Sequence, residues 1–82
     1  MNYAELIGKV IAWLRESKGL SQEVLSGLAG LDRTHYSKIE RGLRAPTIET
    51  LFKIAHALDM KPHEVMMEIE KSVQSAQESE VE

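Results

Sequence analysis

Four polar side chains near the middle of this 82-residue chain have the types and spacing needed to bind a nucleic acid. They share one side of a helix predicted over residues 33–41, and they are Arg33, Thr34, Ser37 and Lys38. Such side chains can hydrogen-bond base edges in the major groove. Tyr36 and Ile39 fall on the opposite side, three positions apart, where they can anchor the helix in a core. The pattern therefore predicts a helix that is held on one side and offers the other side to bases.

The residues just before this helix predict a second short helix and a tight turn. Ser21 is a good N-cap for a helix that ends near residue 29, which places Gln22 at the helix N-terminus. Ser26 is small, as a close crossing of two helices requires, and Gly30 tolerates the positive φ of a turn. Two short helices joined in this way form a helix-turn-helix over residues 21–41.

Apolar residues recur at helical spacing along the chain and predict five helices. The first covers residues 3–18; Asp32 caps the third, Thr47 caps the fourth, and the fifth begins near Pro62. The residues expected to face inward are Leu6, Ile7, Val10, Ile11 and Leu14, then Val24, Leu25 and Leu28, then Ile48, Leu51, Phe52, Ile54, Ala55 and Leu58, and finally Val65, Met66, Ile69 and Val73. We expect one all-α domain over residues 1–74 and a flexible acidic tail over 75–82, where apolar side chains are sparse.

The net charge of −3 hides an uneven distribution. Residues 33–53 contain five cations and two acids, whereas residues 64–82 contain six acids and one lysine. A basic middle segment of this kind is what backbone phosphates would attract. The chain has no cysteine, no apolar stretch approaching the roughly 20 residues of a membrane span, and no signal-peptide pattern at its start. We expect a soluble cytoplasmic protein with no membrane partner.

The sequence shows no pattern typical of an enzyme active site. The chain contains no glycine-rich phosphate loop and no nucleophile–base pair. His56 and His63 lack the spacing of metal ligands and are expected to be structural or solvated. We expect no enzyme activity, no cofactor and no metal.

Three runs in order, GLSQEVLS at 19–26, GLDRTHYSKIERG at 30–42 and PTIETL at 46–51, resemble the phage-repressor helix-turn-helix family, of the Cro-like or xenobiotic-response-element type. The resemblance covers about residues 6–67. It implies a five-helix lambda-repressor-like DNA-binding domain and a transcriptional regulator, often a repressor. Within the family, the short chain and the Leu-Asp-Arg-Thr start of the third helix look most like controller proteins of restriction-modification systems.

The resemblance also implies roles for single residues. Arg33 and Thr34 would read bases, and Lys38 would contact a base or a phosphate. Residues that would contact backbone phosphates are Gln22, His35, Arg41 and Arg44. An ion pair between Arg15 and Glu40 would tie the first helix to the end of the third.

The chain departs from the family pattern at three positions. Tyr36 stands where the family usually has a smaller aliphatic residue, and His35 stands where Tyr, Ser or another small polar residue is common. An exposed histidine with no contact is the alternative to a phosphate role for His35. Leu43 lies in a loop that is usually polar.

Four apolar residues exceed what a small core needs and suggest a homodimer interface: Trp13, Met66, Met67 and Val73. The alternative is that they cover local edges of the core. A dimer would read a palindromic operator, whose two half-sites lie about one helical turn apart. The expected partners are double-stranded operator DNA and a second copy of the chain, with RNA polymerase as a further candidate. The competing function is an antitoxin-type protein-interaction module with secondary DNA binding.

Overall fold

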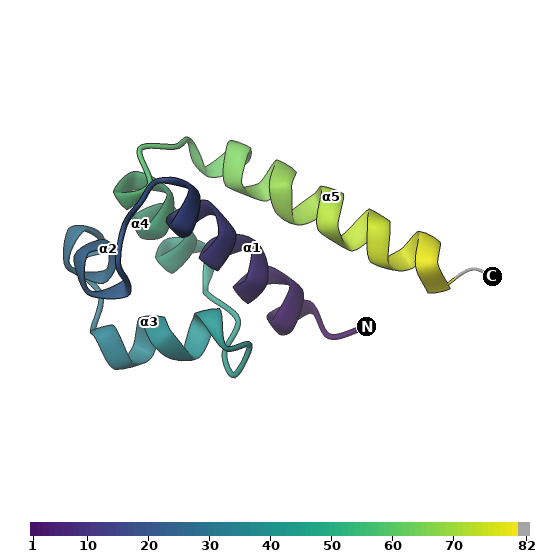
Figure 1. The fold of residues 1–82 in the computed structure, drawn as a ribbon, viewed down its shortest axis with the longest axis horizontal. Helices are drawn as coiled ribbons and strands as arrows, with labels where there is room; N and C mark the ends of the chain where they lie inside the picture. Colours follow the sequence, from purple (N-terminus) through teal and green to yellow (C-terminus); the bar gives the residue numbers. More distant parts are fainter. Residues whose placement is uncertain (81–82) are drawn as a thin grey trace.

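Five helices account for most of the chain in the computed structural model, which describes residues 1–80 (Figure 1). They are α1 (Tyr3–Ser17), α2 (Gln22–Ala29), α3 (Arg33–Glu40), α4 (Ile48–Ala57) and α5 (Pro62–Glu80). Residues 1–80 contain no strand. The predicted five-helix, all-α fold is confirmed.

Local side-chain chemistry sets where these helices begin and end. Ser21, Asp32 and Thr47 each accept a hydrogen bond at 3.1 Å from the backbone N–H three residues later. These bonds satisfy N–H groups that have no partner inside the helix. Gly30 ends α2 in the left-handed conformation, with φ of 68°, and so allows the tight turn into α3. The predicted caps and the predicted turn glycine are therefore present.

The core lies where all five helices meet. In Figure 1, α5 runs along α1 on the side away from α3. α2 and α4 lie near the C-terminal end of α1, at the opposite end of the fold from the chain's N-terminus. α1 packs against α3 and α5, and α2 packs against α3 and α4. The buried apolar residues are Val10, Ile11, Leu14, Leu25, Ala29, Tyr36, Ile39, Leu51, Ile54, Ala55, Leu58, Val65 and Ile69. Because α5 packs on α1 and α4, it does not cover α3, and one side of α3 stays exposed to solvent.

Five residues expected to face inward are exposed instead. In α2, Val24 is 49% and Leu28 is 58% exposed, because Leu25, Ser26 and Ala29 form the side that packs on the neighbouring helices. In α4, the exposed pair is Ile48 and Phe52, and in α5 Met66 is exposed. The apolar stripe on each helix is wider than the surface its neighbours cover, so its margin reaches solvent.

The fifth helix is longer than expected. It continues through Ser75 to Glu80, across most of the segment expected to be a flexible tail; positions 81 and 82 of that segment lie outside the described residues. Val73 packs against the core and Ala76 is half-buried, which extends the contact with the rest of the fold. Alanine, glutamine and glutamate also favour helix. No helix within residues 1–80 has the length and apolar character that crossing a membrane requires.

At Gly8, α1 approaches the last turn of α3 closely. Gly8 is buried, and a Cβ atom there would lie 2.6 Å from the Glu40 carbonyl oxygen and would overlap that of Ile39. Only the absence of a side chain lets the two backbones come this close.

Replacing Gly8 with alanine should therefore lower the free energy of unfolding by about 1–3 kcal/mol, because the backbones must move apart. Gly27→Ala is the matched control: Gly27 is also helical, but it is exposed and has open space around its Cβ direction. We expect that variant to be more stable by about 0.5–1 kcal/mol. Thermal and urea unfolding measure both, and equal effects of the two variants would contradict the close approach.

Candidate nucleic-acid interface

The third helix is anchored on one side and exposed on the other. Tyr36 and Ile39 are fully buried, as predicted for its anchors. Arg33 and Thr34, at its N-terminus, are exposed, and Ser37 and Lys38 are half-buried. The structure thus places all four residues expected to contact bases away from the buried side.

Further polar residues surround this exposed side. His35 lies in the first turn of α3, and its side chain is exposed. Arg41 and Arg44 lie exposed in the loop between α3 and α4. Within residues 1–80, neither these arginines nor Arg33 and Lys38 form an ion pair. The cations around α3 are therefore not neutralised by acids of the described chain.

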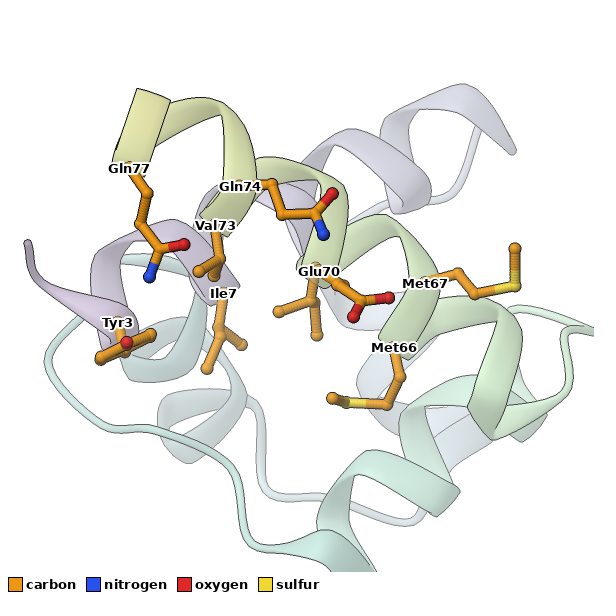
Figure 2. Close-up of a pocket in the computed structure, with 9 residues that line it drawn as sticks. Tyr3, Ile7, Met66, Met67, Glu70, Val73, Gln74 and Gln77 are labelled. Carbon is orange, nitrogen blue, oxygen red and sulfur yellow. The ribbon is translucent and has the colours of Figure 1, made fainter. Parts of the chain in front are cut away.

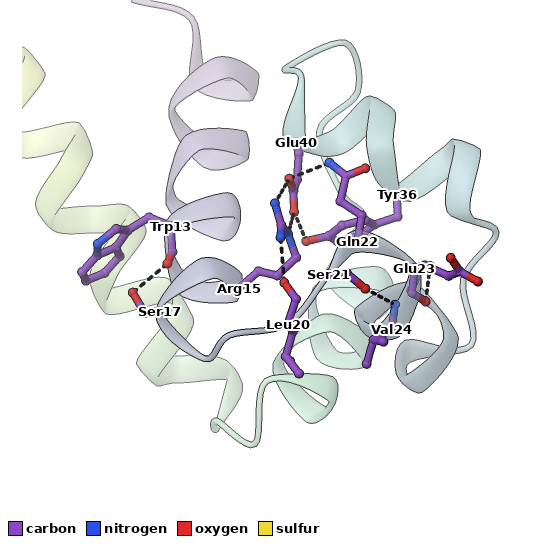
Figure 3. A network of polar contacts seen from close by, with 11 residues as sticks. Trp13, Arg15, Ser17, Leu20, Ser21, Gln22, Glu23, Val24, Tyr36 and Glu40 are labelled. Atoms are coloured by element: carbon purple, nitrogen blue, oxygen red, sulfur yellow. Dashed lines mark hydrogen bonds and ion pairs between the residues drawn. The ribbon is translucent and has the colours of Figure 1, made fainter.

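A nearly buried ion pair links α1 to the end of α3, as the resemblance implied (Figure 3). Arg15 donates from Nε to one Glu40 oxygen at 2.6 Å and from Nη2 to the other at 3.0 Å. Its Nη1 donates to the backbone carbonyl of Leu20 at 2.7 Å, which also ties down the segment before α2. The Glu40 side chain is only 5% exposed. Removing either partner would leave a charge with little access to water.

Two further donors reach the same carboxylate, and sequence reasoning did not find them. Gln22 Nε2 donates to Glu40 Oε1 at 2.9 Å, and the Tyr36 hydroxyl donates to Glu40 Oε2. Gln22 was expected to contact phosphate, yet the structure shows that its amide is already held within the protein. The sequence did contain a signal for the Tyr36 bond: Tyr36 and Glu40 are four residues apart and therefore share a helical face.

This network of Arg15, Gln22, Tyr36 and Glu40, which we call the Glu40 network, shifts the pKa of three members. Burial raises the pKa of Glu40, but hydrogen bonds from Arg15, Tyr36 and Gln22 outweigh it, so the pKa is lowered. The hydrogen bond to Glu40 raises the pKa of Arg15 against the effect of burial. Burial, followed by the bond to Glu40, raises the pKa of Tyr36 well above its usual value. Glu40 is therefore ionised and Tyr36 is a neutral donor at neutral pH.

An apolar groove of about 540 Å³ lies between α1 and α5 (Figure 2). Ile7 and Val73 meet at its centre, Met66 points toward them, and Tyr3 lies at one end. Met67 is at its edge. Three of the four residues expected at a dimer interface thus lie together, although Val73 is half-buried. Trp13 is 55% exposed but does not line this groove, and Tyr3 and Ile7 were not foreseen.

Comparison with known proteins identifies relatives of this chain in sequence and in structure. The sequence model of the family described as Helix-turn-helix matches residues 11–65. The HTH-type transcriptional regulator y4dJ of Sinorhizobium fredii is 38% identical over 66 residues, which cover 80% of this chain and 86% of that protein. The crystal structure of the restriction-modification controller protein C.AhdI from Aeromonas hydrophila is 42% identical and has a TM-score of 0.72, covering 76% of this chain and 94% of that one.

A second similar structure contains DNA. It is the restriction-modification controller protein C.Esp1396I as a tetramer in complex with its natural 35-base-pair operator. It is 31% identical with a TM-score of 0.82, over 90% of this chain and 97% of that chain.

The lowered pKa of Glu40 predicts how stability depends on pH. A carboxylate with a lowered pKa in the folded state stabilises the fold above its unfolded pKa, near 4.5, and loses that contribution as the pH falls through the folded value. Glu40→Gln should be less stable than the wild type by about 3–5 kcal/mol at pH 7, because Arg15 loses its charged partner.

The difference in unfolding free energy between wild type and Glu40→Gln should then shrink as the pH falls below 4.5. Urea unfolding at a series of pH values measures it. Glu70→Gln, at an exposed acid, is the control and should change stability by less than about 0.5 kcal/mol. A difference for Glu40→Gln that stays constant from pH 7 into acid would contradict the lowered pKa.

Proposed function

Because this chain belongs to the helix-turn-helix family, we propose that it is a sequence-specific transcriptional regulator that inserts α3 into the major groove of an operator. The observation that carries the proposal is the division of α3 into two sides. Tyr36 and Ile39 are fully buried, while Arg33 and Thr34 are exposed at the end of the helix that enters the groove in this motif.

In this proposal, residues on the exposed side of α3 contact the bases. An arginine can hold the O6 and N7 atoms of guanine in a bidentate pair, which is the role we assign to Arg33. Thr34 is next to it and is also exposed, and it can contact a base through its hydroxyl or its methyl group. Ser37 and Lys38 lie one turn further along, where they can extend the contact to neighbouring bases.

Backbone phosphates are contacted by groups that surround this side. The N-terminus of α2 offers unpaired N–H groups and a positive dipole, with Gln22 as its first residue. Arg41 and Arg44 are exposed cations beyond the end of α3. His35 is exposed on its first turn and is assigned a weaker phosphate contact.

We further propose that the protein binds a palindromic operator as a homodimer. One α3 reads only a few base pairs, and two copies related by a two-fold axis multiply the affinity. The groove between α1 and α5 supports this, because its lining is mostly apolar and α5 lies across α1 from α3 (Figure 1). A controller relative, C.Esp1396I, assembles as a tetramer on its operator. Since the proposed ligand is operator DNA, the protein would act in the cytoplasm.

Arg33→Ala tests the base-reading role. On a site enriched from a random DNA pool, the variant should lose about 1–3 kcal/mol of binding free energy and accept other bases at one position of each half-site. Its affinity for a scrambled duplex should change much less. Fluorescence anisotropy with both duplexes measures the ratio, and an unchanged ratio would remove Arg33 from base reading.

Arg44→Ala is the matched comparison, since it also deletes one exposed arginine. A phosphate contact carries no sequence information, so this variant should bind both duplexes more weakly. The slope of log affinity against log salt concentration should also flatten by about one unit. If Arg44→Ala discriminated less between the two duplexes while its salt slope stayed the same, its phosphate role would be wrong.

Met66→Glu tests the dimer surface. A charge inside the apolar groove would need to be desolvated on association, so the fraction of dimer should fall at a given concentration. Ser75→Glu adds the same charge at an exposed position of α5 that does not line the groove, and it should leave the dimer intact. Sedimentation equilibrium gives the mass of each variant. Identical masses for Met66→Glu and wild type would place the interface elsewhere.

A further inference from the structure

The Tyr36 hydroxyl makes a hydrogen bond that core packing does not require. The ring of Tyr36 is fully buried, and a phenylalanine ring would fill the same space. The hydroxyl donates instead to Glu40, one turn further along the same helix. A buried hydroxyl needs a partner, but this partner is a carboxylate that also binds residues of two other helices. The bond therefore links the anchor of α3 to groups outside it.

The four donated bonds fix the carboxylate of Glu40. Each of its oxygens accepts two: Oε1 from Arg15 and Gln22, and Oε2 from Arg15 and Tyr36. In Figure 3, Arg15 reaches Glu40 from α1, whereas Gln22 and Tyr36 reach it from the other side. Without the Tyr36 bond, Glu40 Oε2 would keep only the bond from Arg15, and the carboxylate that holds Gln22 would be fixed less firmly.

Gln22 is the member of the network closest to the proposed phosphate site, because it is the first residue of α2. Its amide carries two N–H donors, and Glu40 accepts from only one of them. The second remains for a phosphate oxygen. Ordering a long side chain on binding lowers affinity, and a side chain that is already ordered avoids that loss.

We propose that Tyr36 is a positioning residue for DNA binding: through Glu40, its hydroxyl holds the Gln22 amide ready for a backbone phosphate. Tyr36 itself touches no DNA in this arrangement. The inference rests on the proposed function, since it assigns how one of the phosphate contacts is prepared.

Tyr36→Phe tests it, with Ser75→Ala as a control that also removes one hydroxyl, at an exposed position of α5 that does not line the groove. Both variants are measured at a temperature where circular dichroism shows them fully folded. Tyr36→Phe should bind the enriched duplex about twofold to tenfold more weakly, the effect of ordering one long side chain. Ser75→Ala should bind as the wild type does. Unchanged binding by folded Tyr36→Phe overturns the proposal.

A double-mutant cycle separates positioning from a general structural effect. If Tyr36 acts through Gln22, then Tyr36→Phe should cause no further loss in a Gln22→Ala background. An equal loss in both backgrounds means that the hydroxyl acts otherwise, and it overturns the proposal.

A measurement on the wild-type protein tests the proposal without depending on whether a variant folds. Nitrogen-15 relaxation of the Gln22 side-chain amide, without DNA, should give an order parameter above about 0.6, as expected of a held group. A lower value shows a mobile amide and overturns the proposal. If folded Tyr36→Phe binds normally but Arg33→Ala still loses discrimination, this inference fails and the proposed function stands. If the wild type enriches no site from a random pool, both fail.

Discussion

The arrangement of the first three helices depends on the burial of a single carboxylate. Glu40 is almost inaccessible to water, and a buried charge with a missing partner would cost about 3–5 kcal/mol. The fold supplies donors from three helices: Arg15 from α1, Gln22 from α2 and Tyr36 from α3 itself. Gly8 lets α1 approach the same turn of α3 closely. With this end of α3 fixed and Tyr36 and Ile39 buried, the polar side of the helix faces outward.

Features that depend on local chemistry were predictable from the sequence. The caps at Ser21, Asp32 and Thr47 and the left-handed turn at Gly30 each follow from one residue and its immediate neighbours. The anchors of α3 and the five helices follow from helical periodicity, which records which side of a helix is buried. The Arg15–Glu40 pair followed from the resemblance, because no local rule relates residues 25 positions apart.

Features that depend on tertiary packing were not predictable. Helical periodicity does not show how much of a helix surface the neighbouring helices cover. Val24 and Phe52 were therefore assigned to the core although they are exposed. The composition of the last residues suggested a flexible tail, but contacts that begin at Val73 carry the helix to Glu80. The role of Gln22 within the Glu40 network required the positions of three helices at once.

The outward side of α3 and the N-terminus of α2 are where this chain should meet DNA, with α5 on the far side (Figure 1). Amide chemical-shift mapping of the whole chain against a duplex enriched from a random pool tests that placement most directly. The account predicts that the largest shifts fall at residues 21–23 and 33–38. Large shifts confined to the exposed faces of α1 and α5, with the amides of Arg33 and Thr34 unmoved, would contradict it.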